Sequence, residues 1–193
     1  SGNSHEKMRH AVVFAKACPT DTSAMLGWWQ PVSNDAPGAT EIWCAQENAN
    51  FEFSLLLPNG MVCIGSINAS NDGVFSYPPI DPYCVVVSKR YGGQRQILIQ
   101  LCPTNLLSGR AAIAPSGVWQ FLFKTKKDNQ EPVQIYTHWG GRNPSLPQRL
   151  WPSRFILSNA FQSVVALTGD GSLLGSGCGQ ETYMVGGYQK WNP

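Results

Sequence analysis

Few residues of this chain have types and spacings that could support acid–base or metal chemistry. The three histidines, His5, His10 and His138, are too far apart in sequence to form a local metal pair, and we expect each to be solvated or hydrogen-bonded. No G-x-S-x-G elbow, H-E-x-x-H motif or phosphate-binding P-loop is present. The sequence therefore predicts no metal site, no bound cofactor and no self-contained catalytic machinery.

The six cysteines are widely separated, and none belongs to a C-x-x-C pair, which argues against a zinc knuckle. Four of them lie in or beside segments with a strand pattern: Cys44, Cys63, Cys84 and Cys102. Buried free thiols are expected there in preference to disulfides. Cys18 and Cys178 lie outside such segments. Many pairings of six cysteines are possible, and the sequence does not choose among them.

The tryptophans divide into two groups. Those at apolar positions of strand patterns are predicted to lie in the core, and they are Trp29, Trp43 and Trp119. The candidate exposed aromatics, which are also the candidate binding residues, are Trp28, Trp139 and Trp151. A row of exposed tryptophans on a β-sandwich would favour carbohydrate binding.

The stretch Ala114–Phe123 gives the clearest signal for the elements that must position these residues. Pro115-Ser116-Gly117 suits a turn, because proline presets one φ angle and glycine accepts a positive one. Trp119, Phe121 and Phe123 then share one face of an extended strand, with polar residues on the other. Three large aromatic side chains on one face require an apolar partner layer, which favours a second sheet.

Phe51–Leu57 and Met61–Ile67 flank the turn Pro58-Asn59-Gly60 and form the best hairpin of the sequence. Asn68–Pro82 is predicted to be a long polar loop, and no amphipathic helix is expected. Further strands are predicted at His10–Lys16, Asp21–Gln30, Glu41–Cys44, Tyr83–Ser88, Gln94–Cys102, Val133–Trp139 and Thr182–Tyr188. The fold class is therefore all-β, an antiparallel β-sandwich of jelly-roll type with short flanking segments. We place the sandwich at residues 11–160, between an N-terminal flank of residues 1–10 and a small-residue-rich segment of residues 161–193.

The composition narrows the classes of partner. The chain has 193 residues, of which 42% are hydrophobic, and this suits one domain with a proper core. Only 13% are charged, about half the usual share, which suggests contact with further polypeptide. The net charge is +2, and the basic cluster Lys124–Lys127 lacks interleaved aromatics, so no nucleic-acid partner is expected. No apolar run is long enough to span a membrane, so no membrane partner is expected either.

A series of dispersed segments resembles the middle of a group of bacterial subtilisin-like serine peptidases of the S8 family. In these enzymes a β-sandwich is inserted into the peptidase domain, between the oxyanion-hole asparagine and the nucleophilic serine. The resemblance covers nearly all of the chain and depends on the order and spacing of its pieces. Gly140-Gly141-Arg142-Asn143 departs from it, since the family usually has an Arg-Asp pair there. The matching segments are Ser1-Gly2-Asn3, Glu41-Ile42-Trp43, Ala114-Pro115-Ser116-Gly117-Val118-Trp119, Ile135–Trp139, Gln148–Phe155, Gly171–Gly179 and Val185-Gly186-Gly187-Tyr188.

The resemblance implies a role for each part of the chain. The catalytic Asp and His would precede Ser1, and the Gly-Thr-Ser nucleophile would follow Pro193. Asn3 would be the oxyanion-hole residue, whose amide donates a hydrogen bond to the tetrahedral intermediate. The sandwich would be a non-catalytic insertion, inactive alone, that shapes substrate access or stabilises the peptidase, while both flanking segments would join the peptidase core. The implied partners are the remainder of the peptidase domain and a polypeptide substrate, and a secreted or cell-envelope bacterial protein is favoured.

Two other functions stay open at the level of sequence. The chain could be a stand-alone β-sandwich module that binds carbohydrate or a protein partner, with the candidate exposed tryptophans as its binding residues. A complete enzyme is the least supported of the three, because no serine lies in a nucleophile motif.

Overall fold

The computed structural model describes residues 10–14, 24–34, 37–45, 51–68, 72–105, 112–125, 131–138, 153–157 and 165–168. These residues form strands and connecting turns, and within them no helix is present that could cross a membrane. The strands are β1 (His10–Val13), β2 (Ala24–Gln30), β3 (Gly38–Ala45), β4 (Phe51–Leu56), β5 (Val62–Asn68), β6 (Gly73–Tyr77), β7 (Cys84–Tyr91), β8 (Gln94–Leu101), β9 (Gly117–Thr125), β10 (Val133–His138), β11 (Arg154–Leu157) and β12 (Val165–Thr168).

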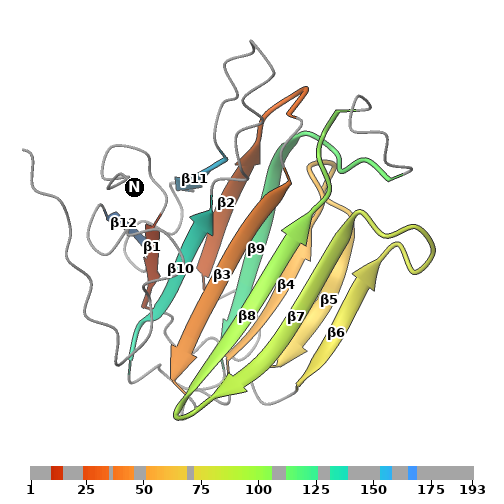
Figure 1. The fold of residues 1–193 in the computed structure, drawn as a ribbon. Coiled ribbons are helices and arrows are strands. Elements are labelled where there is room, and N and C mark those ends of the chain that lie inside the picture. The colour runs from red at the N-terminus through yellow and green to blue at the C-terminus, as the bar shows by residue number, and fades with distance from the viewer. Residues whose placement is uncertain are drawn as a thin grey trace, which may run out of the picture.

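The strands form two antiparallel sheets that face each other (Figure 1). Sheet A has seven strands in the order β12-β1-β10-β3-β8-β7-β6, and sheet B has five in the order β11-β2-β9-β4-β5. The predicted all-β antiparallel sandwich is therefore confirmed.

The strand pairs are nested in sequence, which explains the path of the chain. β4 pairs with β5, β3 with β8, β2 with β9, and β1 with β10, and these pairs alternate between sheet B and sheet A. The chain thus follows one long hairpin whose two arms are rolled around a common interior, which is the jelly-roll arrangement. β6 and β7 extend sheet A beyond β8. At the other side of the sandwich, β12 is the edge strand of sheet A and β11 is the edge strand of sheet B, and these two strands contact each other.

β9 lies in the middle of sheet B, as expected for the strongest strand signal of the sequence. Trp119, Phe121 and Phe123 are fully buried on its inner face. Gly117, the first residue of β9, has a φ of 119°, and the indole N–H of Trp119 donates to the carbonyl oxygen of Pro115 at 2.9 Å. The prediction of an inward-facing aromatic strand is confirmed. The turn predicted at Pro115-Ser116-Gly117 is absent, because Pro115 and Ser116 lie in irregular chain without a bend and Gly117 already belongs to the strand.

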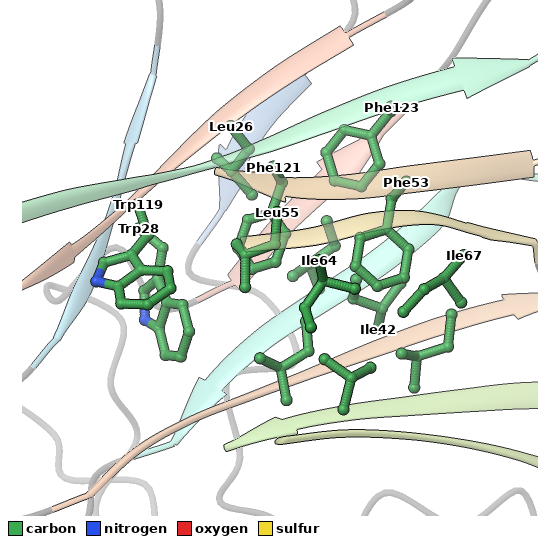
Figure 2. Packing of buried hydrophobic residues seen from close by; sticks show 14 of the residues in the cluster. Leu26, Trp28, Ile42, Phe53, Leu55, Ile64, Ile67, Trp119, Phe121 and Phe123 are labelled. Carbon is green, nitrogen blue, oxygen red and sulfur yellow. The ribbon is translucent and has the colours of Figure 1, made fainter. Parts of the chain in front are cut away.

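The interior is formed by an aromatic layer from sheet B packed on an aliphatic layer from sheet A. Ring centroids of Phe51 and Phe123 are 5.3 Å apart, and those of Trp28 and Phe121 are 5.9 Å apart. Figure 2 shows the aromatic side chains of sheet B together with Ile42 of sheet A. Truncating one such ring to alanine typically costs about 3–5 kcal/mol of folding free energy. The fully buried isoleucines of sheet A are Ile42, Ile97, Ile99 and Ile135.

The predicted hairpin is present as β4 and β5. Gly60 has a φ of 82° in the turn, and the backbone N–H of Met61 donates to Oδ1 of Asn59 at 3.0 Å. The backbone N–H of Leu57 donates to the carbonyl oxygen of Met61 at 2.8 Å and closes the turn. The local turn chemistry thus fixes the connection as expected.

Two sequence interpretations need correction. The segment Asn68–Pro82 contains the edge strand β6 and is not a continuous loop, because Phe75 and Tyr77 pack against the core while Val74 is 70% exposed. The sandwich also extends past residue 160, because β12 pairs with β1 in sheet A. The strand predicted at Thr182–Tyr188 lies outside the described residues.

Candidate functional site

Three of the four predicted site residues cannot be placed. Asn3, Trp139 and Trp151 all lie outside the residues that the structure describes. The oxyanion-hole assignment and two of the candidate exposed aromatics therefore stay predictions.

The fourth, Trp28, was wrongly predicted to be an exposed aromatic, because it is fully buried. Its ring packs on Phe121 in the interior, and no face of it is available to a ligand. The adjacent Trp29 takes the outer face of β2, where the guanidinium carbon of Arg154 lies 5.1 Å from its ring centroid. Trp29 and Trp43 are half-buried rather than core residues, whereas the core placement of Trp119 is confirmed.

The buried end of Trp28 is held by a polar network that joins the two sheets. Its indole N–H donates to Oγ1 of Thr137 at 3.0 Å. The Thr137 hydroxyl donates to the carbonyl oxygen of Ala39 at 3.1 Å, and the Ser153 hydroxyl lies 3.0 Å from it. Since the single Thr137 proton goes to Ala39, the Ser153 hydroxyl is the donor of the remaining bond. The network satisfies buried polar atoms and has a structural role.

His10 is the one histidine whose side chain the structure describes, and it also has structural partners. It is 5% exposed, and its Nε2 lies 2.7 Å from Oε1 of Gln134. Its ring stacks on Tyr136 with centroids 4.3 Å apart. The expectation of a hydrogen-bonded histidine is confirmed here. Within the described ranges no group of three or more His, Cys, Asp or Glu residues is arranged to hold a metal ion.

A buried cation lies at one end of the interior. The Arg95 side chain is 3% exposed, and its Nη1 lies 2.7 Å from Oδ1 of Asp72 and 2.9 Å from the Ser88 hydroxyl. Cys44 is paired with Arg95 across β3 and β8. Burial raises the pKa of the Cys44 thiol to about 11, and the nearby guanidinium opposes this shift. A paired, hydrogen-bonded guanidinium of this kind is a structural ion pair rather than a reactive centre.

The outer face of sheet B is the best candidate for an interaction surface. Its side chains alternate with the buried aromatic layer, and about half of them are apolar, whereas the others include Glu52, Gln120 and Lys124. Val62 is 56% exposed there, and Met61 beside it is 58% exposed. The sequence analysis missed this surface, although the apolar residues between the core positions of β2 and β9 signal it. The apolar residues of this face are referred to below as the apolar outer face, and they are Met25, Trp29, Leu56, Val62, Val118, Leu122 and Ile156.

The outer face of sheet A also mixes polar and apolar side chains. Trp43 and Tyr91 lie with ring centroids 6.2 Å apart, and Nζ of Lys89 is 5.4 Å from the Tyr91 centroid. The indole N–H of Trp43 donates to Oε2 of Glu41 at 3.0 Å, so its polar atom is already bonded within the protein. This face therefore combines charged and aromatic side chains, with the polar atom of Trp43 already bonded.

No family model and no curated protein sequence matches this chain. Among solved structures, the fold is similar to the structure of the Clostridium perfringens CspB protease, with a TM-score of 0.52 and 15% sequence identity. The match covers 84% of this chain and 30% of that protease chain. This chain therefore spans about a third of the length of the protease. At this level of identity the comparison shows a shared fold.

Proposed function

We propose that this chain is the non-catalytic β-sandwich insertion of a subtilisin-like serine peptidase together with short flanks of the peptidase core, and that it is inactive alone. The observation that carries the proposal is the fold match, in which 84% of this chain corresponds to 30% of a protease. The match agrees with the sequence resemblance, which independently predicts a β-sandwich inside a longer peptidase. The partners in this role are the remainder of the peptidase domain and a polypeptide substrate.

The architecture suits a rigid accessory domain. Its interior is continuous and closed, with fully buried rings such as Trp119 and Phe121, and the Thr137 network ties the two sheets together. A rigid body of this kind can hold a loop or a neighbouring domain in place without changing shape itself. In the proposed role it either shapes the access of substrate to the peptidase cleft or stabilises the catalytic domain.

The apolar outer face supports contact with further polypeptide. Val62 and Met61 are more than half exposed, and partly exposed apolar residues such as Leu56 and Leu122 lie on the same face of sheet B beside polar ones such as Gln120. Exposed apolar side chains that gather on one face favour an interaction site. The low share of charged residues, 13%, points the same way.

In this proposal Asn3 is the catalytic contribution of the chain. Its side-chain amide donates to the negatively charged oxygen that develops on the scissile carbonyl, a contact made in the transition state and worth about 3–4 kcal/mol. The Asp, His and Ser of the triad lie in flanking sequence, before Ser1 and after Pro193.

The coding sequence on both sides of this segment tests the proposal first. We expect Asp and His motifs of a subtilisin-like peptidase upstream and a Gly-Thr-Ser motif downstream. In the longer protein, Asn3→Ala should lower kcat by about 10²–10³-fold with little change in KM. Ser4→Ala, one residue away, should retain nearly full activity. Flanks without these motifs would remove the peptidase assignment.

The carbohydrate-binding alternative loses one of its three candidate residues, because Trp28 is buried. A glycan array probed with the 193-residue chain separates the two functions. The peptidase proposal predicts no binding. Specific binding that Trp151→Ala abolishes would favour the alternative.

A further inference from the structure

The chain enters and leaves the sandwich at one corner. β1 begins at His10 and β12 ends at Thr168, and these two residues are direct partners in the antiparallel pairing of the two strands. The Cα atoms of such partners lie about 5 Å apart. No described strand precedes β1 or follows β12. The chain before His10 and the chain after Thr168 are therefore attached to the sandwich at almost the same point.

This corner belongs to one of the two narrow sides of the sandwich. We call that side, which is formed by β1, β11 and β12, the entry edge (Figure 1). β5 and β6, which are the last strands of sheets B and A, contact each other at the opposite edge. Since sheet A has seven strands, its two edges are about 30 Å apart along the sheet.

The entry edge leaves part of the apolar interior incompletely covered. Phe14, which directly follows β1, is 52% exposed. Leu157 on β11 and Leu167 on β12 pack against the core but are only partly buried. Ile156, the neighbour of Leu157, belongs to the apolar outer face, so apolar side chains continue from this edge onto sheet B. A surface of this kind suits a polypeptide partner.

We propose that the peptidase core packs on the entry edge of the sandwich and that the β5–β6 edge points away from it. This inference rests on the proposed function, in which the sandwich is inserted into the chain of a longer peptidase. An inserted domain needs an entry and an exit that lie close together, because the host chain is interrupted at one place. The pairing of His10 with Thr168 meets this requirement.

The place of Asn3 in the sequence limits how far the reaction centre lies from this edge. In the proposed function Asn3 is the oxyanion-hole residue, and it precedes His10 by seven positions. A fully extended chain advances at most about 3.6 Å per residue, so the connection allows at most about 25 Å between Asn3 and His10. The peptidase cleft is therefore tethered within this reach of the entry edge.

Site-specific photo-crosslinking in the longer protein tests the proposal. Benzoylphenylalanine, which on irradiation reacts only with atoms beside it, takes the place of Ala166 on β12 in one variant and of Ser76 on β6 in the matched control. Both are exposed residues of edge strands. We expect position 166 to form an intramolecular cross-link to a residue outside 1–193, located by mass spectrometry, and position 76 to form none.

A second readout does not depend on the cross-linker. Ala166→Arg should lower the melting temperature of the longer protein by at least about 2 °C and leave that of the 193-residue chain unchanged, because the added charge disturbs only the contact with the peptidase core. Ser76→Arg should change neither melting temperature. Equal shifts in the longer protein and in the 193-residue chain would contradict the contact.

A cross-link from position 76 to the peptidase core would overturn the proposal. So would a cross-link from position 166 that stays within residues 1–193, or the absence of any cross-link from that position. The wild-type longer protein shows which proposal has failed. If it cleaves peptide bonds while position 166 gives no cross-link outside the chain, only the packing on the entry edge is wrong. Flanks without the peptidase motifs would instead remove the proposed function itself.

Discussion

Two threonines that lie opposite each other in sheet A illustrate how the contribution of a buried hydroxyl to folding stability depends on its hydrogen-bond partners. Thr40 and Thr137 are directly opposite across β3 and β10, and both are buried. The Thr137 hydroxyl bonds to Trp28, Ala39 and Ser153. The Thr40 hydroxyl finds no hydrogen-bond partner among the residues that the structure describes. The pair therefore provides a matched comparison within one site.

We expect Thr137→Val to lower the free energy of unfolding by about 1–3 kcal/mol, because the buried indole N–H of Trp28 loses its acceptor. Thr40→Val, which has the same change in shape, should be neutral or stabilising, since it removes an unpaired buried hydroxyl. Urea unfolding of both variants measures the difference. An equal loss of stability in the two variants would contradict the stabilising role of the Thr137 hydrogen bonds.

Alkaline pH should destabilise the reduced protein. The pKa of Cys44 rises from its ordinary value of 9.0 to about 11 on burial, so above pH 9 the unfolded chain releases a proton that the folded chain keeps. Stability is therefore unaffected by this group below pH 9 and falls between pH 9 and about pH 11. Urea unfolding should show that the free energy of unfolding falls between pH 8 and pH 10.5, and that this fall is about 2 kcal/mol smaller in Cys44→Ala than in the wild-type protein. An unchanged drop in that variant would contradict the burial of the thiol.

Residue patterns predicted some side-chain positions and failed for others, for an identifiable reason. Trp119 was assigned correctly because polar residues alternate with it along β9. Trp28 and Trp29 were assigned to the wrong faces because β2 is apolar on both sides, so alternation carries no signal there. Which of the two tryptophans points inward depends on sheet A, where Thr137 accepts the hydrogen bond of the Trp28 indole.

At the scale of elements, the hairpin turn was the most predictable feature. Pro58-Asn59-Gly60 was recognised because the required φ angles select its residue types locally. The turn predicted at Pro115-Ser116-Gly117 is absent, although Gly117 has the positive φ angle that its residue type suggested. The edge strand β6 was missed, since its apolar residues lie between Asn-Asp-Gly and Pro-Pro sequences typical of loops. The bulges of β5 were not predicted either, because they depend on the pairing with β4.

The start of β9 gives a direct test of how a positive φ angle constrains the sequence. Gly117 has a φ of 119°, and an added Cβ would lie 3.0 Å from Cβ of Pro58. We expect Gly117→Ala to lower the free energy of unfolding by about 1–3 kcal/mol. Gly65→Ala is the control, because Gly65 has open space around its Cβ position, and it should change stability by less than about 0.5 kcal/mol. Denaturation curves of the two variants that coincide would show that the first position of β9 tolerates a side chain.

At the scale of the whole molecule, the sequence predicted an antiparallel sandwich of jelly-roll type but not which strands pair in it beyond the β4–β5 hairpin. Alternating apolar residues and frequent turns suffice for an antiparallel sandwich. β1 pairs with β10, and β2 pairs with β9, over long stretches of sequence. His10 and Tyr136, for example, are more than a hundred positions apart. No local sequence pattern encodes such pairs. The same nesting gives the rigid body that the proposed accessory role requires, with one apolar outer face available for a partner.

The most direct test of the central claim is labelling with a fluorophosphonate, which reacts covalently with an activated serine nucleophile. The account predicts that the longer protein is labelled on a serine outside residues 1–193 and that the isolated 193-residue chain is not labelled at all. A label on any serine within these residues, or a longer protein that takes no label while cleaving no peptide, would contradict it.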